Sequence, residues 1–146
     1  MFKTDRSRRT IMMALARTHK EWIKHMRICA LEVGIPDSYR MIIMYLSRNP
    51  GANQKMLAEF ANKTTAAINQ TVKEMQSNGY IRKEIDENDQ RYTRLFLTEK
   101  GEEKSEMLKA RLHQSDKLIT SVITEEKEKE LIEILDNLCE VIRRDL

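Results

Sequence analysis

Residues 86–101, DENDQRYTRLFLTEKG, carry the strongest structural signal in this sequence. They read as a polar loop containing the Asp-x-Arg of Asp89 and Arg91, then a strand in which apolar and polar residues alternate, and then the start of a helix. Immediately before them, Asn78-Gly79 ends a helical segment and residues 80–85 read as a first strand. A helix, a glycine stop and a two-stranded ribbon with a cation at its tip are typical of a winged helix. Such a module binds the major and minor grooves of DNA.

The segment before the ribbon predicts a helix-turn-helix. Asn53 is a good N-cap for a short helix, Asn62-Lys63 breaks that helix, and Thr64 caps a second helix that runs to about Ser77. The second helix is amphipathic. Its apolar stripe consists of Ile68, Val72 and Met75. Because the apolar stripe is expected to pack on the domain, the polar stripe on the other side stays free to meet base edges.

Long helices flank this core on both sides. The pattern predicts a helix from about residue 7 to residue 32, ended by Gly34-Ile35-Pro36, and Asp37 or Ser38 is expected to cap the next helix. After the ribbon, Thr98 and Thr124 are expected to begin two further helices. The last helix carries a seam of apolar residues with 4-3-4 spacing: Leu131, Leu135, Leu138 and Ile142.

We therefore expect a mainly α fold with a small two- or three-stranded β wing, namely a winged helix-turn-helix with long N- and C-terminal dimerisation helices. The expected divisions are residues 1–35 for the N-terminal dimerisation helix, 36–98 for the DNA-binding domain and 99–146 for the C-terminal dimerisation helices. The terminal helices carry more apolar surface than the small core can cover, so we expect them to pack on a second copy. The alternative is that they bury one another within a monomer.

Composition and charge agree with a DNA-binding protein. Of the 146 residues 34% are charged, and the net charge of +3 divides into +5 for residues 1–35, +2 for residues 36–98 and −4 for residues 99–146. A basic front and an acidic rear would orient the molecule on DNA, the alternative being ordinary solvated helix faces. No signal peptide and no apolar run of about 20 residues is visible, so we expect a cytoplasmic protein without membrane association. The sequence contains no phosphate loop and no catalytic Ser/His/Asp set, so neither an enzyme nor a cofactor is indicated.

The ordered set of motifs resembles the multiple antibiotic resistance regulator (MarR) family of bacterial transcription factors. The matching motifs span about residues 49–101 and are Asn49-Pro50-Gly51, Gln54-Lys55-Met56-Leu57-Ala58, Thr64 as a helix cap, Asn78-Gly79-Tyr80-Ile81, Asp89-Gln90-Arg91 and Leu95-Phe96-Leu97-Thr98-Glu99-Lys100-Gly101. The resemblance implies an obligate homodimer with interlocking terminal helices, usually a repressor, that binds a pseudo-palindrome in double-stranded DNA. It also implies that a ligand or an oxidant releases the DNA. The ligand pocket would lie between the dimerisation helices and the winged domain.

The predicted DNA-binding residues fall into three groups. Arg91 at the wing tip is expected to enter the minor groove, and Asp89 is expected to aim it by hydrogen bonding. The recognition helix contributes Thr64, Thr65, Asn69, Gln70 and Lys73, of which Lys73 is expected to meet phosphate. Phosphate-positioning contacts are expected from Asn53, Gln54, Lys55, Arg40 and Arg94. Gln70 and Ala67 stand where the family often has Arg and Ser or Thr, which leaves the base preference open but not the docking mode.

The sequence leaves the effector open. Trp22, Met26, Tyr39 and Met44 are candidates for a small-molecule pocket, although methionines at helical spacing are commonly core residues. Cys29 and Cys139 are candidates for redox sensing or for small core residues, and a redox- or metal-responsive regulator of the same fold is an alternative. His19 and His25 are six residues apart and do not share a helix face, so no metal site is indicated. A further alternative is a winged-helix module that binds protein, but the basic wing with Arg91 and Arg94 favours DNA.

Overall fold

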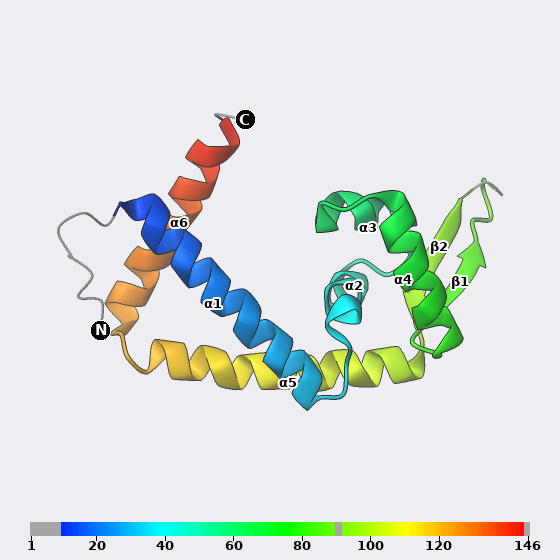
Figure 1. Ribbon diagram of the computed structural model, residues 1–146, viewed down its shortest axis with the longest axis horizontal. Helices are drawn as coiled ribbons and strands as arrows, with labels where there is room; N and C mark the ends of the chain where they lie inside the picture. The colour runs from blue at the N-terminus through cyan, green and yellow to red at the C-terminus, as the bar shows by residue number, and fades with distance from the viewer. Residues whose placement is uncertain (1–9, 90–91, 145–146) are drawn as a thin grey trace, which may run out of the picture. The chain divides into compact units, whose positions relative to one another are not determined.

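The computed structural model describes residues 10–89 and 92–144. Its elements, in chain order, are α1 (Ile11–Glu32), α2 (Asp37–Arg48), α3 (Gln54–Ala61), α4 (Thr65–Ser77), β1 (Ile81–Ile85), β2 (Thr93–Leu97), α5 (Glu99–Thr120) and α6 (Glu125–Arg144) (Figure 1). This is the mainly helical fold with a small β wing that the sequence predicted. The chain divides into two compact units, one ending at Lys109 and the other beginning at Ala110.

The wing of the first unit is an antiparallel ribbon in which Ile81 pairs with Leu97 and Ile85 pairs with Thr93. A single bridge between Ala52 and Leu95 adds a short third contact to the ribbon. Leu95 and Leu97 are buried whereas Arg94 is exposed, which confirms the predicted alternation along β2. The largest fully buried apolar side chains come from every part of the unit and include Ile35, Ile43, Leu46, Leu57, Val72, Met75, Ile81, Leu95 and Leu108. These residues hold α4 and the wing on one common core.

The start of α5 packs tightly against the start of β1. A Cβ atom added to Gly101 would lie 2.2 Å from the backbone oxygen of Tyr80, so only glycine fits at this position. The Thr98 hydroxyl accepts a hydrogen bond from the Gly101 N–H at 3.2 Å and donates one to the Gly79 carbonyl at 2.6 Å. The Thr-x-x-Gly motif therefore begins a helix and, in addition, joins that helix to the end of α4.

The predicted N-caps are confirmed at most helix starts. Asn53, Thr64, Thr98 and Thr124 each accept a hydrogen bond from the backbone N–H three residues later. Thr10 does the same for α1, and the predicted earlier start of that helix falls on residues outside the described part of the chain.

The prediction that Asp37 or Ser38 caps α2 is wrong. Pro36 occupies the N-cap position without a side-chain cap bond, and Asp37 is the first residue of the helix. The Asp37 carboxylate instead accepts hydrogen bonds from Arg40 at 3.0 Å and from Arg27 at 3.1 Å. Proline is well suited to a helix start because its fixed φ suits the helix entry, and this frees the aspartate for the two arginines.

The second unit contains the end of α5 and all of α6. No residue of α6 is buried, and the side chains of Leu131, Leu135 and Ile142 on the predicted seam are exposed. Apolar residues at this spacing on an exposed helix leave a stripe available for a partner. Among the described residues, no helix has both the length and the apolar character needed to cross a bilayer.

Candidate nucleic-acid interface

The turn between α3 and α4 fixes the angle at which the second helix leaves the first. Asn62 adopts φ 49°, a left-handed conformation that ends α3, and the Thr64 hydroxyl then caps α4 at 3.2 Å from the Ala67 nitrogen. Across the two helices the Gln54 side chain lies 3.4 Å from the Asn69 carboxamide oxygen. Gln54 and Asn69 were each predicted to contact DNA, and in the structure these two side chains contact each other.

The recognition helix α4 has the predicted two faces. Ile68, Val72 and Met75 are buried, whereas Thr65, Gln70 and Lys73 are exposed and Asn69 is half-buried. Glu74 was not predicted from the sequence, and its carboxylate accepts a hydrogen bond from the Gln70 side chain at 2.9 Å. The i, i+4 spacing of these two residues was the available signal. The exposed face of α4 therefore carries a negative charge beside its amides and its lysine.

The wing loop is organised by Asp86, which the sequence analysis did not identify. Its carboxylate accepts hydrogen bonds from the Asn88 nitrogen at 2.8 Å, the Asp89 nitrogen at 3.2 Å and the Arg94 side chain at 2.5 Å. The hydrogen bond from Asn88 and then the one from Arg94 lower the pKa of Asp86 below its ordinary value of 3.8. An aspartate that accepts from the backbone two and three residues later forms an Asx turn, which explains the shape of the loop.

Of the two residues predicted to act at the wing tip, the structure describes Asp89 but not Arg91. Arg91 lies outside the described residues, so its role stays a prediction. The backbone oxygen of Asp89 accepts a hydrogen bond from the Tyr92 nitrogen at 2.9 Å, which closes the loop. Arg94, predicted to touch phosphate, has an exposed side chain with its Nε held by Asp86.

Arg40 occupies a different position from the one expected of a phosphate contact. The residue is only 9% exposed, and its Nε donates to Asp37. Burial by itself raises the pKa of Asp37, but the hydrogen bonds and charges of Arg40 and Arg27 outweigh burial and lower it. Arg40 is thus paired within α2, while Arg27 joins the same aspartate to α1, and we therefore leave Arg40 out of the proposed DNA surface. Asn53 is used as a helix cap, and Lys55 is exposed with its Nζ 4.0 Å from Glu59.

The candidate pocket residues differ in burial. Met26 and Tyr39 belong to the core, Met44 is half-buried and Trp22 is exposed. The Tyr39 hydroxyl accepts a hydrogen bond from the Asn78 amide at 2.8 Å, and its ring meets Tyr80 edge-on. Tyr39 is thus committed to the contact between α2 and the end of α4.

The candidate sensor residues are also placed. Cys29 is buried with its sulfur 3.3 Å from the His25 Nε2, a pair one helical turn apart that the sequence analysis did not predict, and Cys139 is exposed. Within residues 10–89 and 92–144, no three His, Cys, Asp or Glu side chains gather in a way that could hold a metal ion.

Sequence comparisons agree with this geometry. A sequence profile of the MarR family matches residues 33–91. The chain is 33% identical over 107 residues to the uncharacterised HTH-type transcriptional regulator YybA of Bacillus subtilis (strain 168), covering 70% of each protein. It is 29% identical over 105 residues to the HTH-type transcriptional regulator BilQ of Clostridium symbiosum (strain WAL-14163), covering 72% of this chain and 73% of that protein. These relatives are transcriptional regulators and not enzymes.

Solved structures share the fold. A MarR family transcriptional regulator from Listeria monocytogenes, complexed with a 26mer DNA, matches with a TM-score of 0.79 and 20% identity over 94% of this chain and 91% of that one. NadR in complex with 4-hydroxyphenylacetate matches with a TM-score of 0.73 and 23% identity over 94% of this chain and 97% of that one.

Proposed function

The chain belongs to the MarR family of transcriptional regulators, and on this premise we propose that it is a homodimeric cytoplasmic repressor that a small molecule releases from DNA. Each subunit places α4 in the major groove of a pseudo-palindromic operator and the wing against the adjacent minor groove. Residues 36–98 read the DNA, and residues 1–35 and 99–146 form the dimer.

One observation carries the DNA-binding part of the proposal, namely the exposed polar stripe of α4 on a helix whose other side is buried. Gln70 and Asn69 have the carboxamide chemistry that pairs with adenine, and Lys73 and Thr65 suit phosphate contacts. The remaining candidates are Asn53, Gln54 and Lys55 at the start of α3 and Thr64 at the start of α4. Arg91 supplies the charge for the minor groove, on a loop that Asp86 and Asp89 shape.

The test of DNA binding is fluorescence anisotropy with the DNA upstream of the protein's own gene and a scrambled duplex, over a salt series. We expect binding that is selective for the upstream duplex. The logarithm of the association constant should fall by about 0.9 per unit of the logarithm of the salt concentration for each phosphate neutralised. Arg91→Ala should weaken binding about tenfold or more. Lys73→Ala should weaken binding to both duplexes alike. Gln70→Ala should mainly reduce the difference in affinity between the two duplexes.

Arg143→Ala, once its dimeric state has been verified by analytical ultracentrifugation, is the matched control, because it removes one positive charge from the exposed end of α6 and leaves the proposed DNA surface intact. Equal effects of Arg91→Ala and Arg143→Ala would contradict the assignment of Arg91. Salt-insensitive and unselective binding by the wild type would instead favour a winged-helix module that binds protein.

Release by a ligand is supported by the fold shared with NadR, whose structure contains 4-hydroxyphenylacetate. Trp22 and Met44, which are not fully buried, are the candidates to line such a site in this chain. The test adds 4-hydroxyphenylacetate and a series of related aromatic acids to the protein–operator complex. A fall in anisotropy at unchanged salt supports the proposal. A complex that survives the whole series but dissociates on addition of peroxide would favour redox release, with Cys29→Ser as the diagnostic variant.

A further inference from the structure

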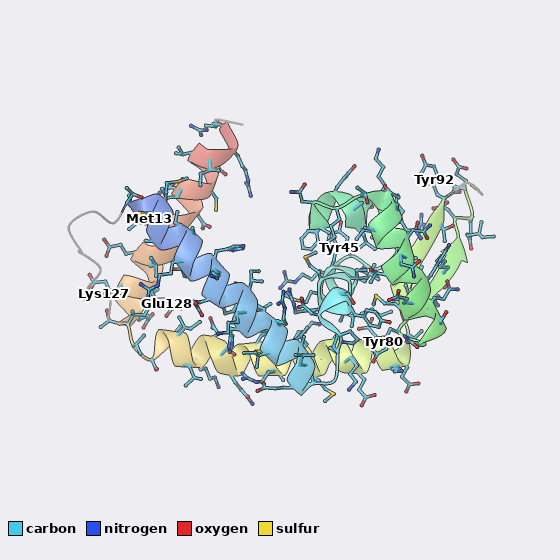
Figure 2. All side chains as sticks on the ribbon, viewed as in Figure 1. Met13, Tyr45, Tyr80, Tyr92, Lys127 and Glu128 are labelled. Carbon is cyan, nitrogen blue, oxygen red and sulfur yellow. The ribbon has the colours of Figure 1, made fainter. Side chains whose placement is uncertain are left out.

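The wing ends in two large apolar side chains that the core does not use. Ile85, the last residue of β1, is 69% exposed, and Tyr92, just before β2, is 55% exposed. Figure 2 shows Tyr92 at the outer end of the wing. Exposed apolar residues at the tip of a recognition element call for an explanation, because that tip is the part that reaches the partner.

Two backbone hydrogen bonds hold Tyr92. Its N–H donates to the Asp89 carbonyl at 2.9 Å, and its carbonyl accepts from the Asp86 N–H at 2.9 Å. The Asp86 carboxylate in turn accepts hydrogen bonds from Asn88, Asp89 and Arg94. An aromatic side chain with two rotatable bonds on a fixed backbone loses little entropy when it binds a surface.

The sequence predicted a basic wing from Arg91 and Arg94, but acidic residues of the same segment balance its positive charges. Residues 81–94 contain four Lys or Arg and four Asp or Glu, so the segment has no net charge. Arg94 is paired with Asp86, while Arg82 forms an ion pair with Glu84 and lies over the Phe96 ring. A segment with no net charge gains little binding energy from the phosphates of DNA. An apolar contact at its tip would add affinity that does not depend on charge.

We propose that Tyr92 packs its ring along the deoxyribose edge of the minor groove beside each operator half-site and supplies a salt-independent part of the affinity. This inference rests on the proposed DNA-binding function. Deoxyribose carbons line the walls of the groove and present an apolar surface, and Tyr92 follows directly after Arg91, the residue proposed to enter the same groove.

The experiment compares wild type, Tyr92→Ala, Tyr92→Phe and Arg91→Ala on a duplex that the wild-type protein selects from a random-sequence pool. Anisotropy is measured from about 50 to 200 mM salt. Tyr92→Ala should bind about tenfold more weakly at every salt concentration, with an unchanged salt slope, because the lost contact carries no charge. Tyr92→Phe should bind like the wild type, and Arg91→Ala should show a shallower salt slope.

Each contrary outcome identifies what fails. If the wild type selects no duplex, the proposed function fails and this inference falls with it. If the wild type binds and Arg91→Ala weakens binding, but Tyr92→Ala binds like the wild type, only the Tyr92 contact is overturned. A salt slope for Tyr92→Ala as shallow as that of Arg91→Ala would also overturn it, because the ring would then act by positioning the arginine. Circular dichroism of each variant verifies that the fold is intact.

Discussion

At the scale of single residues, Asp86 determines the geometry of the wing. Asp86→Asn keeps an oxygen acceptor for the Asn88 and Asp89 N–H groups but loses the charge that holds Arg94, and Asp86→Ala loses both. Operator affinity should therefore decrease in the order wild type, Asp86→Asn, Asp86→Ala, with a total loss of about tenfold, because the loop must then be ordered on binding. Anisotropy measures the affinities. Equal affinity for all three proteins would mean that the turn does not shape the DNA contact.

The two aspartates with lowered pKa values predict the response of stability to acid. Asp37 and Asp86 bind a proton less readily when folded than when unfolded, where the ordinary pKa is 3.8. Both therefore stabilise the fold above that pH and lose their contribution as the pH falls through the lower folded-state value. Urea unfolding between pH 7 and pH 3 should show a fall in stability that is concentrated below about pH 4.

Asp37→Asn should be less stable than the wild type at pH 7 and should lose less stability on acidification. Parallel curves for the two proteins would count against this role of Asp37.

At the scale of elements, a cluster of polar and aromatic side chains fixes the end of the recognition helix. The Asn78 amide donates to the Tyr39 hydroxyl, and Lys100 lies over the Tyr80 ring while donating to the Asn78 carbonyl at 2.8 Å. Tyr39→Phe would remove the hydroxyl of a buried tyrosine and with it the acceptor for the Asn78 amide, so we expect a loss of about 1 kcal/mol in the free energy of unfolding. Urea denaturation measures it, and Tyr92→Phe, at an exposed site, is the control expected to unfold like the wild type. Identical midpoints for both variants would mean that solvent replaces this bond at no cost.

The elements were predictable where the signal is local. Asn53, Thr64 and Thr98 cap helices because their side chains reach backbone groups three residues away, and alternation along residues 93–97 gives the buried face of β2. The predictions failed where a side chain has a partner that its sequence spacing does not indicate. Asp37 is drawn away from a cap by an arginine on α1, and Asp86 acts through a turn and through Arg94, eight residues later. Gly101 was visible as part of a motif, but the close approach of Tyr80 that requires it is a tertiary contact.

At the scale of the whole molecule, α6 is the helix whose apolar residues are left uncovered in the single chain. Its apolar residues at 4-3-4 spacing predicted a seam that packs on a second copy, and in the single chain Leu135 is 38% exposed and no residue of the helix is buried. A helix with such a stripe gains most of its stability by covering it. A second copy of the chain, related by two-fold symmetry, would cover the stripe and set two recognition helices about 34–36 Å apart, one turn of DNA.

This reading predicts that a charge on the stripe separates the subunits without unfolding them. In Leu135→Glu the new carboxylate would have to be buried in the dimer, which costs several kcal/mol, but it disturbs no core within the single chain. Analytical ultracentrifugation should show the wild type at twice 17.2 kDa and the variant close to 17.2 kDa. Asn137→Glu adds the same charge to another face of α6 and should remain dimeric. Leu135→Glu, as a monomer, should also bind the full operator far more weakly, because it engages only one half-site at a time. A wild type that sediments at 17.2 kDa and still binds the operator tightly would show that α6 serves another purpose.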